Sequence, residues 1–308
     1  MPNNLQYALY GILALLVLGT LIIGLKRVTK PGPGDHELWL RMRSWWVMAG
    51  LFILAIAVSK QMAILFFALV SFLALKEYFS IISTRRADRR VLFWAYLAIP
   101  FQYWWVHEAW FGMFFIFIPV YLFLFIPLKM VIVGETQGFL KAAGTLHWGL
   151  MTTVFSLSHA AFLLALPDAN NPAAGGAGLL LFLVFLTQFN DIMQFVWGKL
   201  IGRIKVVPRV SPGKTLGGFL GGVITTTLVA WLIAPYLTPL VGWQPMAAGL
   251  IIGIGGFVGD VTISAIKRDL GIKDSGNMIP GHGGILDRVD SLTYTAPLFF
   301  HFVYYLHY

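Results

Sequence analysis

Residues 5–25, LQYALYGILALLVLGTLIIGL, form a run of 21 residues without a charged side chain. A helix of about 20 apolar residues is long enough to cross the roughly 30 Å hydrocarbon core of a bilayer. No basic segment precedes this run and no small-residue cleavage site follows it. We therefore predict a retained transmembrane helix here rather than a signal peptide.

Nine further apolar stretches follow the first one. The second to fourth of the ten are short for a full crossing, so the sequence predicts eight to ten spans. The nine stretches are residues 45–59, 61–75, 91–106, 110–128, 148–166, 177–196, 218–237, 246–266 and 292–305.

The composition of the 308 residues supports the same class of protein. Hydrophobic residues make up 58% of the chain, charged residues only 11%, and the mean hydropathy is +0.78. Because a soluble domain carries about 25% charged residues, these values exclude a soluble enzyme, a disordered chain and a nucleic-acid-binding module. The absence of cysteine excludes disulfides, zinc–thiolate sites and cysteine nucleophiles. The prediction is an all-α, polytopic membrane protein with no soluble domain.

Lys and Arg residues are distributed unevenly between the connections that join the ten stretches. The odd-numbered connections hold 21 of the 22 basic residues, and Lys60 is the one on the other side. By the positive-inside rule, the basic side faces the cytosol and both termini lie outside, with anionic membrane lipids as partners of the basic loops. The odd-numbered connections are residues 26–44, 76–90, 129–147, 197–217 and 267–291.

Charged and polar residues that could take part in catalysis or ligand binding are concentrated after position 187. Asp191 and Asp260 lie within apolar stretches, where a carboxylate is costly and normally faces a partner or water. Ser264, Lys267 and Arg268 follow Asp260 at i+4, i+7 and i+8, which places them on its face of a helix. A snorkelling carboxylate, or one paired with a basic residue, is the alternative interpretation of each aspartate.

A polar segment that is rich in glycine follows at residues 267–290. Asp287 and Asp290 are spaced i,i+3, which predicts one shared helical face if the tenth span begins here. Separated aspartates suit a hard cation such as Mg²⁺, the basic residues suit phosphate oxygens, and glycine lets backbone N–H groups approach an anion. This combination is typical of phosphoryl or nucleotidyl transfer, although a glycine-rich turn with solvated charges has the same composition.

The order of residues at 264–290 is more specific than their composition. The pattern S-x-I-K-R-x₄-K-D-x-G-x₂-I-P-x-H-G-G-I-x-D-R-V-D resembles the signature of phosphatidate cytidylyltransferases, also called CDP-diacylglycerol synthases. Residues 211–215, SPGKT, and Asp191 with Gly198 resemble further family positions, so the resemblance covers roughly residues 187–295. We accordingly divide the chain into a transmembrane scaffold at 1–176 and a part at 177–308 that carries the catalytic region.

Three positions depart from the pattern of that family. Ile263 stands where an acidic residue is usual, Phe195 where a tyrosine is usual, and Leu216-Gly217 where an aromatic residue and Glu or Gln are common. The missing carboxylate next to the signature serine removes one potential metal ligand. The residues most needed for chemistry are retained, so the expectation is an active enzyme with altered kinetics or lipid preference.

The resemblance implies that CTP and phosphatidate react to CDP-diacylglycerol and pyrophosphate, with the acyl chains in the bilayer and Mg²⁺, alone or with a second cation, as cofactor. It implies no nucleic-acid partner and leaves a homodimer open. The residues to which it assigns catalysis are Asp260, Asp287, Lys267, Arg268 and Arg288. Those assigned to substrate binding are Lys214, Ser264, Lys273, Asp274, His282, Gly283 and Gly284. Those assigned to the metal are Asp260 and Asp287, supported by Asp290 or Asp191.

Other functions are compatible with parts of the sequence. Asp191 and Asp260 could relay ions in a coupled transporter, although the chain shows no internal repeat. The three departures allow a non-catalytic paralogue, or a divergent one that acts on another lipid phosphate. A CTP-dependent polyprenol or phytol kinase is a further alternative.

Overall fold

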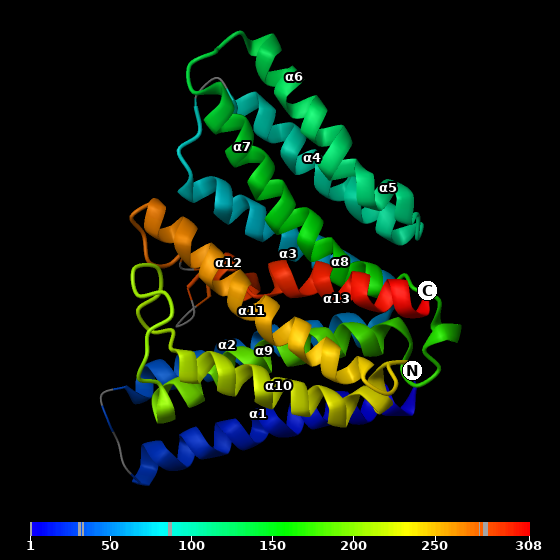
Figure 1. Ribbon diagram of the computed structural model, residues 1–308, viewed down its shortest axis with the longest axis vertical. Helices are drawn as coiled ribbons and strands as arrows, with labels where there is room; N and C mark the ends of the chain where they lie inside the picture. The colour runs from blue at the N-terminus through cyan, green and yellow to red at the C-terminus, as the bar shows by residue number, and fades with distance from the viewer. Residues whose placement is uncertain (1, 30–31, 33, 86–87, 277, 280–282) are drawn as a thin grey trace.

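The computed structural model describes residues 2–29, 32, 34–85, 88–276, 278–279 and 283–308. Within these residues the chain is helical and has no strand beyond two isolated bridges, Lys205 with Thr215 and Ile279 with Gly283. The helices lie side by side in one bundle, and most of them run across the width of the view in Figure 1. The all-α prediction is therefore confirmed.

Each of the ten predicted apolar stretches overlaps a helix among the described residues. In chain order the helices are α1 (Asn3–Thr29), α2 (Asp35–Val58), α3 (Lys60–Ile81), α4 (Arg89–His107), α5 (Phe111–Ile116), η2 (Phe117–Leu122), α6 (Phe123–Val133), α7 (Phe139–Leu150), η3 (Met151–Phe155), α8 (Ser156–Leu163), η4 (Asp168–Asn170), α9 (Gly175–Ile201), α10 (Leu216–Leu237), α11 (Gln244–Asp269), α12 (Leu286–Val289) and α13 (Leu292–His307). Segments α5, η2 and α6 are consecutive, as are α7, η3 and α8. Each set of three therefore corresponds to one predicted apolar stretch.

Seven helices in the described part of the chain are long and apolar enough to cross a membrane: α1, α2, α3, the 111–133 helix, α9, α10 and α11. The remaining predicted stretches correspond to α4, the α7–α8 segment and α13, which pack in the same bundle. The chain is a multi-pass membrane protein.

The helices extend beyond the apolar runs at their basic ends. Residues 26–44 were predicted as a connection, but α1 continues to Thr29 and α2 begins at Asp35. The predicted stretch 61–75 likewise continues to Ile81 in α3 and so includes Lys76 and Glu77. The boundary prediction was wrong because it stopped each span at the first charge, whereas helical hydrogen bonding continues through charged turns at helix ends.

Helices α9 and α10 approach each other closely at glycines. A methyl group on Gly218 would lie 2.6 Å from the carbonyl oxygen of Gln194, and one on Gly222 would lie 2.5 Å from the Gln194 side chain. Small residues permit this contact between helix backbones in a membrane. The loop that precedes α10 is consequently held against α9.

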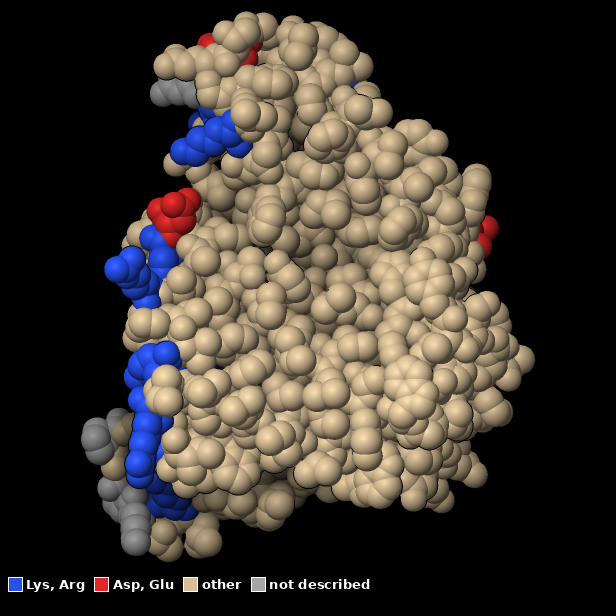
Figure 2. Space-filling model, in the orientation of Figure 1, with Lys and Arg blue, Asp and Glu red and all other residues tan. Residues whose placement is uncertain are grey.

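Basic side chains line one edge of the molecule. Figure 2 shows Lys and Arg in a column along that edge, and in Figure 1 the same edge holds the α1–α2 and α9–α10 connections. The marked chain termini lie together at the opposite edge in Figure 1. This arrangement places both termini on one side, whereas their location outside the cell stays a prediction.

Candidate active site

Four segments meet inside the bundle near its basic edge: α9, the loop before α10, α11, and the turn between α12 and α13. Asp191 is ten residues from the end of α9 and Asp260 nine residues from the end of α11. At 1.5 Å per residue, both carboxylates lie about 14 Å inside the helix ends. The site is thus within the bundle but close to its basic edge.

Lys214 lies at the centre of this site. Its Nζ lies 2.5 Å from Oδ2 of Asp260 and donates to Oε1 of Gln194 at 2.9 Å. Burial opposes its charge, but the carboxylates of Asp260 and Asp191 outweigh this effect and raise the pKa of Lys214. The loop before α10 therefore contributes a stable positive charge to the site.

Two further carboxylates complete an acidic cluster around Lys214. Asp191 accepts a hydrogen bond from Ser291 Oγ at 3.0 Å, and Asp290 accepts one from the Ser291 N–H at 2.7 Å. Burial, and then the charges of Asp260 and Asp191, raise the pKa of Asp290 well above its ordinary value. We call Asp191, Asp260 and Asp290 the acidic cluster.

Gly259 permits the close approach that brings α11 to the Asp290 turn. A methyl group at this position would lie 2.5 Å from the backbone oxygen of Asp290. Ser264, one turn after Asp260, donates to Oδ1 of Asp260 at 3.3 Å. The predicted shared face of Asp260 and Ser264 is thereby confirmed.

Asp287 belongs to a different set of contacts. It accepts from Lys267 Nζ at 2.6 Å, from the Ser275 N–H at 2.9 Å and from the Gly284 N–H at 3.1 Å. Burial raises the pKa of Asp287, but the hydrogen bonds from Lys267 and the two amides outweigh it, so the pKa lies below its ordinary value. Asp287 is an ionised group that holds backbone in place.

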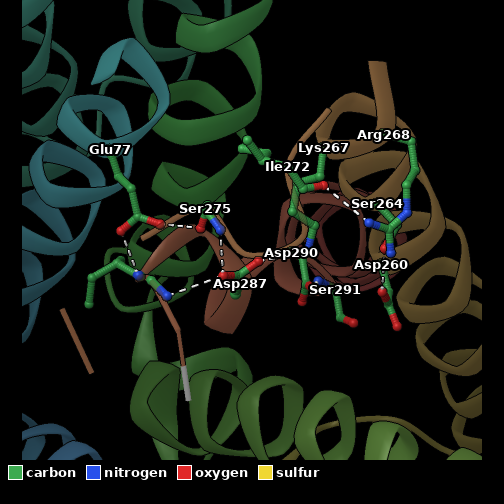
Figure 3. A network of polar contacts seen from close by, with 12 residues as sticks. Glu77, Asp260, Ser264, Lys267, Arg268, Ile272, Ser275, Asp287, Asp290 and Ser291 are labelled. Carbon is green, nitrogen blue, oxygen red and sulfur yellow. Dashed lines mark hydrogen bonds and ion pairs between the residues drawn. The ribbon is translucent and has the colours of Figure 1, made fainter. Parts of the chain in front are cut away.

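Asp287 and Asp290 have different hydrogen-bond partners, and the tenth apolar helix, on which their predicted shared face depended, begins only after both residues. Helix α12 ends at Val289, and Asp290 belongs to the turn before α13. Figure 3 shows Asp287 beside Ser275 and Glu77, with Asp260 and Ser264 on the other side of the view. An i,i+3 pair meets only where the helix continues through both residues.

Other predicted site residues occupy several positions. Arg268 donates from Nε to the Val210 carbonyl and from Nη1 to the Ile272 carbonyl, both at 3.1 Å, so it connects two loops. Lys273 and Asp274 are exposed on the loop after α11. Gly283 has a φ of +81°, which favours glycine. His282 lies outside the described residues.

Two buried donors near the acidic cluster lack acceptors among the described residues. They are Nε of Arg288 and Nε2 of Gln194. Buried polar groups are normally hydrogen-bonded, so such donors are available to an anionic ligand. Arg288 also acts electrostatically on Asp191 and Asp290, which places its charge close to the cluster.

The departures from the family pattern do not remove groups from the cluster. Ile263 is 1% exposed in the hydrophobic core, and Phe195 is exposed with Lys199 Nζ 4.4 Å from its ring centroid. A methyl group on Gly217 would lie 3.0 Å from the Ile201 backbone oxygen, so a side chain there would be in tight contact with the end of α9. Ile263 and Gly217 are therefore accounted for by local packing, whereas Phe195 is an exposed side chain of α9.

Sequence reasoning missed Glu77 of α3. It accepts from the Ile285 N–H at 2.7 Å and contacts Ser275 Oγ, although it precedes both residues by about 200 positions. Next to Lys76 at the end of an apolar stretch, Glu77 resembles an ordinary helix-end charge. Its side chain is 6% exposed, which only the tertiary structure reveals.

No three Asp, Glu or His side chains among the described residues form a group that could hold a metal by themselves. Magnesium, however, is commonly bound by one or two carboxylates together with substrate phosphates. The acidic cluster brings three carboxyl groups together with the positive charges of Lys214 and Arg288. Its oxygens fit a cation that binds together with a nucleotide.

A comparison of the sequence with models of known protein families identifies the family of this chain. The model of the cytidylyltransferase family matches residues 39–306 of the chain. This chain therefore belongs to the cytidylyltransferase family and is a nucleotidyltransferase enzyme.

Individual relatives agree with this assignment. The chain is 49% identical over 301 residues to the uncharacterized protein YnbB of Escherichia coli, covering 98% of this chain and 99% of that protein. It is 38% identical over 136 residues to the phosphatidate cytidylyltransferase of Haemophilus influenzae, 42% of this chain and 47% of the relative. It is 50% identical over 116 residues to that of Synechocystis, 37% of this chain and 39% of the relative. The chain thus matches less than half the length of these two enzymes.

Proposed function

We propose that this enzyme transfers the cytidylyl group of CTP to phosphatidate, forming CDP-diacylglycerol and pyrophosphate. The observation that carries the proposal is the acidic cluster around Lys214, with the unpartnered donors of Arg288 and Gln194 beside it. The 264–290 signature and the two partially matched relatives support phosphatidate as the acceptor.

The reaction needs charge neutralisation more than proton transfer. The second pKa of a phosphomonoester is roughly 6, so the lipid phosphate is largely dianionic near neutral pH and needs no general base. One of its oxygens forms a bond to the α-phosphorus of CTP, and the bond from that phosphorus to the bridging oxygen breaks to release pyrophosphate. Lys214 and Arg288 reduce the repulsion between the two polyanions and orient them.

The acidic cluster is the proposed place for Mg²⁺, because it brings the carboxyl oxygens of three aspartates together beside Lys214, and Mg²⁺ prefers such oxygen ligands. Bound there, Mg²⁺ would neutralise the triphosphate and the departing pyrophosphate. Asp287 as a ligand stays a prediction, which the geometry does not favour because its carboxylate already accepts three hydrogen bonds. A second cation also stays a prediction.

The experiment that tests the function uses purified protein with CTP, Mg²⁺ and a series of lipid acceptors. We expect a CDP-lipid with phosphatidate and little product with polyprenyl phosphate or diacylglycerol. Product with another lipid phosphate but not with phosphatidate would replace the proposed acceptor. Absence of product from folded protein with every acceptor and divalent cation would support the non-catalytic alternative.

Lys273 is exposed on the loop after α11, where it is proposed to contact substrate phosphates. Lys273→Ala is expected to raise KM for CTP or phosphatidate about tenfold with kcat nearly unchanged, because it removes a contact made equally in the ground and transition states. Lys60→Ala is the matched control. Lys60 is the first residue of α3 and is exposed far from the site in the sequence, so its loss should change neither KM nor kcat. Equal losses in kcat and kcat/KM would contradict this role.

We also propose that the basic edge faces the cytosol, where CTP is available. The chain has no cysteine, so single cysteines can be labelled without background. Cysteines at the exposed residues Ala169 and Val241 should react with an impermeant maleimide added to intact cells, and those at Thr136 and Lys205 should not. Labelling of Lys205→Cys from outside would place the site on the wrong side for cytosolic CTP.

A further inference from the structure

Glu77 is a buried acid that the proposed reaction does not use. It lies in the last turns of α3, and no Lys, Arg or His among the described residues forms an ion pair with it. Its carboxylate instead accepts hydrogen bonds from the connection between α11 and α12. Buried polar groups are normally hydrogen-bonded, and these donors satisfy the oxygens of the Glu77 side chain.

Glu77 and Asp287 together hold the two ends of one loop. Glu77 accepts from Ser275 Oγ and from the Ile285 N–H, while Asp287 accepts from the N–H groups of Ser275 and Gly284. Each carboxylate therefore bridges residue 275 to residues 284–285. We call residues 273–285 the signature loop. Figure 3 shows Glu77, from α3, pointing toward Ser275 of this loop.

Two glycines of the signature loop fit against the Glu77 carboxylate. A methyl group on Gly284 would lie 1.6 Å from Oε1 of Glu77, and one on Gly276 would lie 3.1 Å from its Cδ. Any side chain at position 284 would therefore displace Glu77. The glycine at 284 is explained by the approach of a protein carboxylate rather than of a phosphate.

We propose that Glu77 is a positioning residue that fixes the signature loop, so that Lys273 and the acidic cluster face the same substrate. The assignment to substrate phosphates rests on the proposed function, whereas the anchoring of the loop does not. Glu77 acts through Ser275 and Ile285 and does not touch the reacting atoms. A carboxylate suits this role because both of its oxygens accept hydrogen bonds and neither donates.

A spin label tests the anchoring without any assay of activity. Met278 in the signature loop is 48% exposed, and Met278→Cys would be the only thiol for a nitroxide. Glu77→Leu should clearly increase the mobility of the label, and Glu77→Gln and Ser275→Ala should each do so less. Glu108→Gln, an exposed acid at the end of α4, is the matched control and should leave the spectrum unchanged.

Kinetics separate positioning from folding. Glu77→Leu should raise KM for CTP about tenfold and lower kcat about tenfold, while Glu77→Gln should raise KM only about threefold. Loss of folded protein alone would lower kcat and leave KM unchanged. Glu77→Gln combined with Ser275→Ala should cost less than the product of the two single effects, because both remove the same contact.

The inference is overturned if the label on folded Glu77→Leu is as immobile as on the parent protein. If Glu77→Leu does not fold, unchanged mobility in both Glu77→Gln and Ser275→Ala overturns it equally. If the parent protein is inactive with every lipid acceptor but Glu77→Leu still increases the mobility of the label, the anchoring is supported and the proposed function is rejected. The two failures are therefore distinguishable.

Discussion

Asp260→Asn is expected to lower kcat by about 10²-fold or more, with the protein still folded. Asparagine preserves the size of the side chain and an acceptor for Ser264, but it removes the charge that faces Lys214 and would hold Mg²⁺. Interactions that strengthen as charge develops in the transition state have effects of this size. The measurement is kcat and KM for CTP over a Mg²⁺ titration.

Asp269→Asn provides the matched control for this substitution. Asp269 is exposed at the end of the same helix, so its loss should change kcat less than about twofold. Nearly normal activity of folded Asp260→Asn at every Mg²⁺ concentration would show that the metal assignment is wrong. Asp260 would then be the structural partner of Lys214.

Asp287→Asn is expected to destabilise the protein by about 3 kcal/mol or more, because it leaves the buried ammonium of Lys267 without a countercharge. The side chains of this pair are only 11% and 5% exposed. Lys267→Met in the same chain removes that ammonium, and the asparagine oxygen can still accept from the backbone amides. The double variant should therefore recover most of the lost stability in a denaturant titration in detergent.

The activity of that double variant separates two roles of Asp287. If Asp287 only positions the loop, the stable double variant should retain activity within about tenfold of the parent enzyme. A stable double variant that has lost 10²-fold or more in kcat would contradict positioning. It would show that Asp287 or Lys267 contacts the metal or the substrate, as the sequence predicts.

The sequence predicted the helices well because the signal for them is local. Each apolar stretch reports its own environment, and the ten stretches all correspond to helices among the described residues. The ends of α2 and α3 were not predicted, because charged end turns such as Asp35 and Glu77 look like loop residues in a hydropathy pattern. Only tertiary packing decides whether such turns stay helical.

The sequence predicted where the site lies in the chain better than it predicted which residues lie together there. The sequence placed Asp260, Asp287 and Lys267 in one polar region, whereas in the structure Asp260 pairs with Lys214 in the acidic cluster and Asp287 pairs with Lys267 beside the signature loop. Spacing along a long loop does not fix the direction of a side chain. Glu77 could not be predicted at all, because its contacts join residues about 200 positions apart.

The most direct test of nucleotidyl transfer follows the phosphorus atoms of CTP. Purified enzyme is incubated with phosphatidate, Mg²⁺ and CTP that carries label either at the α- or at the γ-phosphate, and the lipid fraction is counted. The account predicts that α-label enters the lipid, that γ-label leaves as pyrophosphate, and that Asp260→Asn abolishes most of the transfer. Entry of γ-label into a lipid, with release of CDP, would contradict the account and show a CTP-dependent kinase.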